Sequence, residues 1–245
     1  MAVTFDSTFE KGINSVGASP FSFVSNAGTV TGSVGANSNR ILIVALCLAR
    51  EATFWGNKTM KATKGGSLSA MTHIVSTDYA SGTLRSVCLF GMIAPDTGNI
   101  TLEFSWDSGN SAQTVYMGAI SLYNCDQATG WRNNGSDTGT TNSPQPSSIV
   151  TTSNGNIAVV AHGDNNASSI TLNAGTQAWK DTSFNTNSAM GYMASTGATA
   201  TIGWDIGSSV AWGQVKVDVM ASGATAAQLV PAYTQTGGTW SQIYV

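Results

Sequence analysis

The residues of this sequence that could carry out acid–base or metal chemistry are few and scattered. Its two histidines are His73 and His162, and the second begins the triplet His162-Gly163-Asp164. A histidine beside a carboxylate can serve as a general base or as part of a metal site. Neither histidine has another histidine or a paired cysteine nearby in the sequence to complete a triad or a zinc site. The histidine pattern therefore predicts no catalytic residue and no metal ligand.

The glutamates give no stronger indication of catalysis. The chain has three, Glu10, Glu51 and Glu103, whereas glycoside hydrolysis needs two carboxyl groups that face each other across a cleft. No two of the three belong to one strand, and Glu103 is expected to face solvent. The chain also has no GxSxG, HExxH, P-loop or GxGxxG pattern. We therefore expect a protein that is not an enzyme and needs no cofactor, with a glycosidase that uses Glu103 or Glu51 as the enzymatic alternative.

Two predicted turns concentrate oxygen atoms of the kind that calcium binds. They are the segments 106–110 (WDSGN) and 163–166 (GDNN). Neither has the spacing of an EF-hand, and Asp and Asn are common in turns because their side chains bond to nearby backbone groups. We interpret both segments as ordinary turns and predict no bound metal.

Some of the seven tryptophans could form surfaces on which sugar rings stack. Trp106, Trp204 and Trp212 occupy alternating positions of predicted strands, which favours burial. Trp131, in the predicted loop QATGWRNNG, and Trp179 are better candidates for exposure. These two are the candidate ligand-binding residues of a carbohydrate-binding module or adhesin, and burial against a loop or another subunit is the competing interpretation.

The elements that must position these residues are predicted to be short β-strands. The most hydrophobic stretch, SNRILIVALCLARE, has nine consecutive apolar residues from Ile41 to Ala49. A membrane span needs about 20, and β-branched residues in so short a run favour a strand buried on both faces. Further strands are predicted at 53–62, 71–79, 84–93, 101–106, 112–123, 156–162, 168–173, 176–182, 188–195 and 199–205, with weaker signals at 3–5 and 21–31.

One more predicted strand, GQVKVDVMA (213–221), alternates in polarity. Successive side chains of a strand point to opposite faces, so its three valines should lie in the core. Gln214, Lys216 and Asp218 are then expected to face solvent.

Two pairs of segments repeat in the same order along the chain. The segment 38–49 is echoed by 154–164, and 99–123 is echoed by 200–222. Two Greek keys folded into one jelly roll would produce this pattern. We therefore predict an all-β fold, a two-sheet jelly-roll sandwich over 38–222, with an N-terminal segment at 1–37 and a C-terminal extension at 223–245.

The C-terminal extension, GATAAQLVPAYTQTGGTWSQIYV, is rich in aromatic and aliphatic residues for a chain end. Such residues are rarely left in water. The extension is therefore expected to pack either on its own domain or on a neighbouring subunit. The candidate subunit-contact residues are Leu229, Tyr233, Trp240, Ile243 and Tyr244.

The charge content of the chain excludes some partners. Only 9% of the residues are charged, the net charge is −3, and the pI is near 5.1. Binding to nucleic acid depends on many phosphate contacts from basic side chains, and binding to anionic lipid on a basic cluster. Ten scattered Lys and Arg residues provide neither. We expect no nucleic-acid partner and no membrane partner.

The cysteines and the N-terminus bear on where the protein works. Cys47 and Cys88 lie in apolar runs, where a free thiol behaves as a small hydrophobic group, and with Cys125 they make an odd number. Free buried thiols are thus expected, with a structural disulfide as the alternative. The first residues have no apolar signal core, so we expect synthesis in the cytoplasm without a signal peptide.

Several segments resemble, in matching order, one family pattern. It is similar to a jelly-roll domain of tailed-bacteriophage virion proteins, including head-decoration and fibre-like proteins, and of repeats in bacterial surface proteins. The resemblance covers about 38–222 and transfers no catalytic residue. Its hairpin has Gly56-Asn57 where the family has two glycines. The matching segments are SNRILIVALCLA (38–49), TFWGNKTMKA (53–62), MIAPDTGNITLEFSW (92–106), GAISLYNCDQATGW (118–131) and GNIAVVAHGD (155–164).

The resemblance implies a non-enzymatic structural protein located in the virion. A capsid decoration or cement protein that stabilises the phage head is the first expectation. Its partners would be further copies of itself, by resemblance often in a trimer, and the major capsid protein. A tail-fibre component or adhesin that recognises surface glycans is the alternative.

Overall fold

The computed structural model describes residues 1–14, 20–25, 32–50, 59–81, 83–106, 112–141, 147–150, 154–165, 167–184, 186–223, 232–236 and 239–243. Within these ranges all regular secondary structure consists of β-strands. The described residues therefore include no helix that is long and apolar enough to cross a membrane. The strands are β1 (Thr4–Asn14), β2 (Phe21–Val24), β3 (Ile41–Arg50), β4 (Thr59–Lys64), β5 (Ser67–Ala70), β6 (Thr72–Ser81), β7 (Thr83–Ile93), β8 (Thr101–Ser105), β9 (Ala112–Tyr123), β10 (Trp131–Gly139), β11 (Ser147–Val150), β12 (Ile157–Asp164), β13 (Ile170–Leu172), β14 (Thr176–Phe184), β15 (Thr186–Ala194), β16 (Thr199–Ile202), β17 (Trp204–Ile206), β18 (Trp212–Val219), β19 (Ala232–Thr236) and β20 (Thr239–Ile243).

The prediction of an all-β sandwich is confirmed. The apolar run from Ile41 to Ala49 forms β3, and none of its residues is more than 5% exposed. It pairs with β7 on one side and β9 on the other, so the strand is central in its sheet and covered on both faces. This is the environment that its unbroken apolar sequence predicted.

The first half of the chain forms a complete jelly roll. Its larger sheet has the antiparallel order β1-β9-β3-β7-β6, and its smaller sheet has the order β2-β8-β4-β5. Strands from the beginning and the end of the half lie side by side in each sheet, which is the Greek-key crossover of a jelly roll. β1 and β2, from the N-terminal segment, are part of this arrangement.

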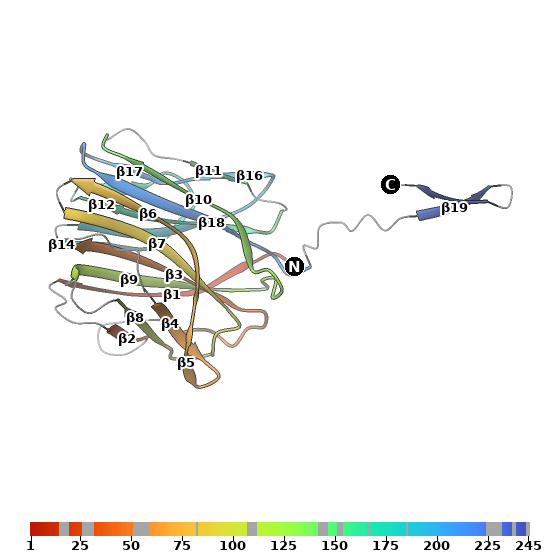
Figure 1. Ribbon diagram of the computed structural model, residues 1–245, viewed down its shortest axis with the longest axis horizontal. Coiled ribbons are helices and arrows are strands. Elements are labelled where there is room, and N and C mark those ends of the chain that lie inside the picture. Colours follow the sequence, from red (N-terminus) through yellow and green to blue (C-terminus); the bar gives the residue numbers. More distant parts are fainter. Residues whose placement is uncertain are drawn as a thin grey trace.

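The second half repeats this topology. Its larger sheet has the order β10-β18-β12-β15-β14, and the pairs β11-β16 and β13-β17 take the place of the smaller sheet. The internal duplication that the sequence indicates is therefore present in the strand order. Each half contributes its own pair of layers, so the sandwich contains four layers rather than the two that were expected (Figure 1).

The two five-stranded sheets pack face to face, and we call the side-chain layer between them the seam. β3, β7 and β9 supply one side of the seam, and β12 and β18 supply the other. Each five-stranded sheet also packs against its own outer strands, and one further apolar cluster lies in each of these two layers. At the edges, β1 contacts β14, and β6 contacts β10 and β18. Both central sheets are therefore apolar on both faces.

The outer layers explain one wrong prediction. Gln214 and Asp218 were expected to face solvent but are buried, because the second five-stranded sheet has strands packed on both of its faces. The side-chain oxygen of Gln214 accepts a hydrogen bond of 3.1 Å from the backbone N–H of Trp204, and its side-chain amide donates one of 3.3 Å to the carbonyl of the same residue. Asp218 accepts a hydrogen bond of 2.9 Å from the side chain of Asn156. Each polar group thus has a partner that offsets the cost of its burial.

Predicted core tryptophans and thiols are where they were expected. Trp106, Trp204 and Trp212 are all buried. Cys47 and Cys88 are buried free thiols, as is Cys125, and no disulfide links them.

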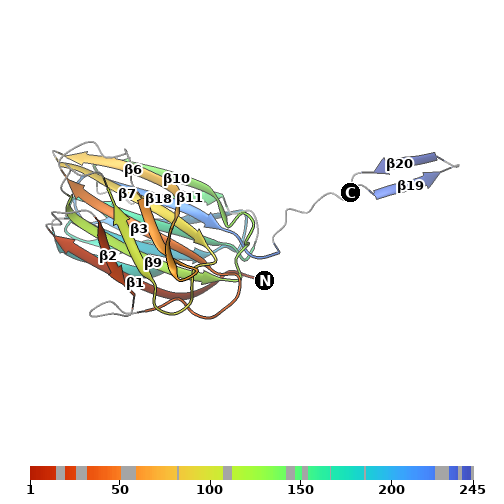
Figure 2. The same ribbon diagram turned by 60° about the horizontal axis from the view of Figure 1, so that its bottom comes forward.

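The C-terminal extension contains a two-stranded hairpin, in which β19 pairs with β20. In both views this hairpin lies clear of the sandwich (Figures 1 and 2). We call the sandwich formed by β1 to β18 the body. Its last residues lie near the N-terminus, because the amino group of Met1 donates a hydrogen bond of 3.2 Å to the carbonyl of Ser222. Met1 and Ser222 therefore lie side by side.

Candidate functional site

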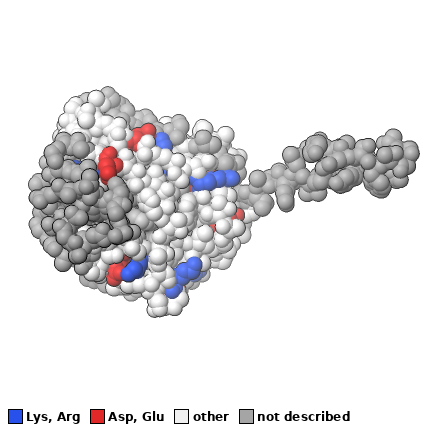
Figure 3. Space-filling model, viewed as in Figure 1, with Lys and Arg blue, Asp and Glu red and all other residues white. Residues whose placement is uncertain are grey.

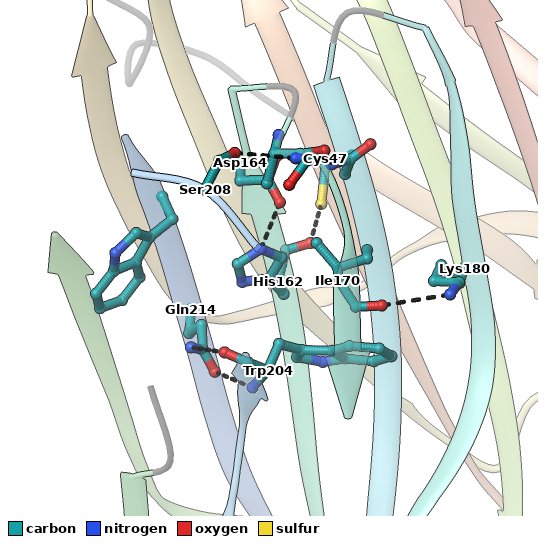
Figure 4. Close-up of polar contacts among 12 residues, drawn as sticks. Cys47, His162, Asp164, Ile170, Lys180, Trp204, Ser208 and Gln214 are labelled. Carbon is teal, nitrogen blue, oxygen red and sulfur yellow. Dashed lines mark hydrogen bonds and ion pairs between the residues drawn. The ribbon is translucent and has the colours of Figure 1, made fainter. Parts of the chain in front are cut away.

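A fully buried polar pair, His162 and Asp164, lies on β12. Residues two apart on a strand share a face, and Nε2 of His162 lies 2.9 Å from Oδ2 of Asp164. Both side chains are fully buried, and Figure 4 shows the contact between them. The ring of Trp204 lies 6.4 Å from the imidazole, centroid to centroid. An ionised carboxylate only accepts hydrogen bonds, so Nε2 carries the hydrogen and donates it, and Nδ1 is left without a hydrogen bond among the described residues.

The second oxygen of Asp164 closes the turn that follows β12. Oδ1 accepts hydrogen bonds from the backbone N–H of Ala167, at 2.8 Å, and from the side-chain amide of Asn187, at 3.0 Å. Asn187 also donates to the carbonyl of Ala167 at 2.9 Å. These contacts occupy Oδ1 of Asp164 and tie the end of β12 to Asn187 of β15. Asn166 itself lies outside the described residues.

The Cys47 thiol lies close to this pair, on the seam side of β12. Its Sγ donates to the carbonyl of His162 at 3.4 Å (Figure 4). Burial raises the pKa of the thiol to about 12, an increase that a hydrogen bond with Ser188 partly offsets. A thiol with so high a pKa is protonated at neutral pH and is a poor nucleophile. The cluster of Cys47, His162 and Asp164 therefore links two layers of the core.

Trp179 is not exposed, contrary to the prediction. Only 4% of its surface is accessible, and its ring lies in the seam over the backbone of β9. A Cβ atom on Gly118 would overlap this indole ring, so the absence of a side chain at position 118 creates the space that the ring fills. The ring therefore packs the two halves together and offers no stacking surface to a ligand.

Beside Trp179, a carboxyl pair bridges the edges of the two central sheets. Glu10 on β1 and Asp181 on β14 line one crevice with Gly12, Tyr116 and the Trp179 ring already described, and the crevice has no space for a water molecule. Oε2 of Glu10 is buried without a hydrogen bond. Burial, and then the charge of Asp181, raise the pKa of Glu10 from 4.5 to about 7.

This pair predicts that the stability of the body depends on pH. Glu10 binds its proton more tightly in the folded chain, so the free energy of unfolding should fall as pH rises from about 4.5 to about 7. One pKa unit corresponds to about 1.4 kcal/mol, and because the carboxyl is half-buried we expect a loss of roughly 1–2 kcal/mol. Urea unfolding at several pH values in this range measures the change in the free energy of unfolding.

Glu10→Gln should remove this part of the pH dependence, since an amide does not titrate. Glu103→Gln is the matched control, because Glu103 lies on the outer sheet and pairs there with Lys61 at 2.8 Å. Equal pH profiles for the wild type and Glu10→Gln would show that Glu10 does not titrate in this range.

Trp131 is half-buried and borders an open hollow at one end of the seam. It was expected in a loop but is the first residue of the edge strand β10, where it pairs with Val219. The hollow has a volume of about 410 Å³. Of the two tryptophans proposed for ligand binding, Trp131 therefore lies at a solvent-facing hollow and Trp179 does not.

The structure leaves the other candidate residues apart from one another. His73 is exposed on β6, where its ring lies 5.3 Å from that of Phe90. Glu51 and the segment 107–110 lie outside the described residues. In the part of the chain that is described, no three His, Cys, Asp or Glu side chains gather closely enough to hold a metal ion.

The predicted subunit-contact residues are divided between the described and undescribed parts of the extension. Tyr233 is paired with Gln242, Trp240 with Gln235, and Ile243 with Ala232 in the β19–β20 hairpin. Leu229 and Tyr244 lie outside the described residues. The role of all five in subunit contact stays a prediction.

The chain matches no family model and no curated protein. Among solved structures, it is similar to a chain from the structure of infectious bursal disease virus, Gx strain, with 12% sequence identity and a TM-score of 0.19 over 89% of this chain. This chain spans 43% of the length of that viral chain. A TM-score this low is no basis for an argument about fold or function.

Proposed function

We propose that this protein is a non-enzymatic structural component of a virion, and that it acts as a decoration or cement protein on the capsid. One observation carries the proposal: a double jelly roll with buried central sheets is joined to a C-terminal hairpin whose sequence includes Tyr233, Trp240 and Ile243. In this arrangement the body is the stable folded part, and the hairpin binds the neighbouring subunit or capsid protein. Its partners would be further copies of the chain and the major capsid protein.

The body supports this proposal because its layers are tightly connected and its surface has little charge. Both central sheets are buried on both faces, and local unfolding is rare where apolar contacts are dense. On the described part of the face shown in Figure 3, charged side chains form a few small groups among uncharged ones. Such a body suits a particle that must persist outside a cell.

The hairpin supports this proposal because a two-stranded hairpin is marginally stable alone in water. Its sequence contains Tyr233, Trp240 and Ile243, and burial of such residues stabilises an interface by about 25 cal/mol per Å² of apolar surface. Docking on a neighbour, by strand addition or in a groove, would bury these residues.

Deletion of 226–245 tests this proposal. We expect the shortened chain to keep its β-sheet circular dichroism and its cooperative unfolding, but to lose binding to capsid shells in a co-sedimentation assay by at least tenfold. The matched point variants are Tyr233→Ser with Trp240→Ser, against Thr234→Ala with Ser241→Ala in the same hairpin. If the shortened chain bound shells as well as the full chain does, the hairpin would not be the contact.

A further inference from the structure

The hollow beside Trp131 is formed by strands of both jelly rolls. Lys64 of β4, Ala70 of β5, Thr72 of β6 and the segment 91–93 of β7 come from the first half, while Thr129 and Trp131 lie at the start of the second. Its volume of about 410 Å³ falls within the range of small-molecule sites. Its lining combines an aromatic ring with hydroxyl groups and an amine.

The Trp131 ring packs against the backbone of β7, which fixes its position. A Cβ atom at Gly91 would lie 2.6 Å from Cη2 of Trp131, so the ring rests directly on the backbone of β7. Ile93 and Trp131 both pack against the apolar cluster of the seam. The ring is therefore supported by the sheet beneath it while it borders the hollow.

The turn before Trp131 is also held in place. Oδ1 of Asp126 accepts hydrogen bonds from the backbone N–H groups of Ala128, at 2.8 Å, and Thr129, at 2.7 Å. These bonds, that of Thr129 foremost, lower the pKa of the Asp126 carboxyl, so it stays ionised and keeps the turn. Gly130 has a φ of +77°, which lets the chain enter β10 directly. An aromatic group that is already in place loses little entropy when a ligand binds.

Polar groups surround the ring. Nζ of Lys64 donates a hydrogen bond of 2.8 Å to the carbonyl of Ile93, which positions the amine at the rim and leaves two of its three N–H donors for other acceptors. Thr72 and Thr129 are exposed and add hydroxyl groups. A sugar ring has the complementary chemistry, with one apolar C–H face and hydroxyl groups around its edge.

We propose that this hollow binds a hexopyranose unit of a carbohydrate. The C–H face of the sugar stacks on Trp131, and its hydroxyl groups bond to Lys64, Thr72 and Thr129. This site would let the protein attach to a glycan-coated surface. It does not depend on the virion role proposed above.

Saturation-transfer NMR with the methyl glycosides of glucose, galactose, mannose and N-acetylglucosamine, each at millimolar concentration, tests this site. We expect at least one of them to bind, and titration with that glycoside should show binding at least tenfold weaker for Trp131→Ala. Lys64→Ala should weaken binding about threefold to tenfold. Lys61→Ala is the matched control, because Lys61 lies on the same strand but pairs with Glu103, and it should leave binding unchanged.

Gly91→Ala provides a second variant in case Trp131→Ala fails to fold. The added methyl group displaces the ring from its support, and binding should again fall at least tenfold. If none of the four glycosides bound, or if binding were the same in the Trp131, Gly91 and Lys64 variants as in the wild type, the proposal would be wrong.

Discussion

Replacing Asp164 by alanine is expected to lower the free energy of unfolding by about 3–5 kcal/mol, because each buried donor that loses its acceptor costs about 1–3 kcal/mol. The change leaves three buried donors without their acceptor: Nε2 of His162, the side-chain amide of Asn187 and the backbone N–H of Ala167. Water does not reach these groups to replace the bonds, because His162 and Asp164 are fully buried. Urea unfolding followed by circular dichroism measures the loss.

Two matched variants separate this role from a general effect of removing an aspartate. Asp164→Asn keeps the shape and one acceptor oxygen, so it should cost about 1–2 kcal/mol. Asp137→Ala removes a carboxylate that is 44% exposed and pairs with Lys216 at 2.8 Å, and it should cost less than about 1 kcal/mol. A loss for Asp164→Ala as small as that for Asp137→Ala would mean that the buried cluster does not stabilise the fold.

Replacing Trp179 by alanine should lower the free energy of unfolding by about 3–5 kcal/mol, as is typical for a buried aromatic side chain. The ring fills the space above Gly118 between the two central sheets, so its loss opens a cavity in the seam. A ligand-binding tryptophan at the surface would instead change stability little. Equilibrium unfolding in urea therefore tells the two roles apart.

Gly118→Ala tests the same contact from the other side. Its added methyl group collides with the ring and should cost about 1–3 kcal/mol. In the double variant, Trp179→Ala with Gly118→Ala, the methyl group enters the space that the ring has left. The loss of unfolding free energy in the double variant should therefore be smaller than the sum of the two single losses by at least about 0.5 kcal/mol. Strict additivity would show that Trp179 and Gly118 do not contact each other in solution.

Local sequence patterns predicted the strands whose alternation or apolar character was strong. The unbroken apolar run of β3, the alternation in β8 and the repeated order of segments all reflect side chains that the fold buries. β10 was missed because it is a polar edge strand, held by backbone hydrogen bonds to β18 that leave no trace in its side-chain pattern. Trp131 was placed in a loop for the same reason.

The contacts that cross the seam could not be predicted, because alternation shows which residues share a face but not what covers that face. Gln214 and Asp218 alternate like surface residues and are buried by a further layer. Glu10 and Asp181 lie far apart in the sequence and meet only because β1 and β14 are edge strands of facing sheets. One sign available beforehand was a glycine within a strand, such as Gly118, because such a glycine often marks the close approach of another group.

The central claim is that this chain is a structural part of a virion, and quantitative mass spectrometry of purified particles tests it most directly. Particles produced by cells that carry the gene should be purified on a density gradient and analysed for this chain and for the major capsid protein. We predict that the chain co-purifies with intact particles at a constant ratio to the capsid protein across the gradient. Its absence from particles, with all of the chain recovered in the unassembled protein fractions, would contradict the claim.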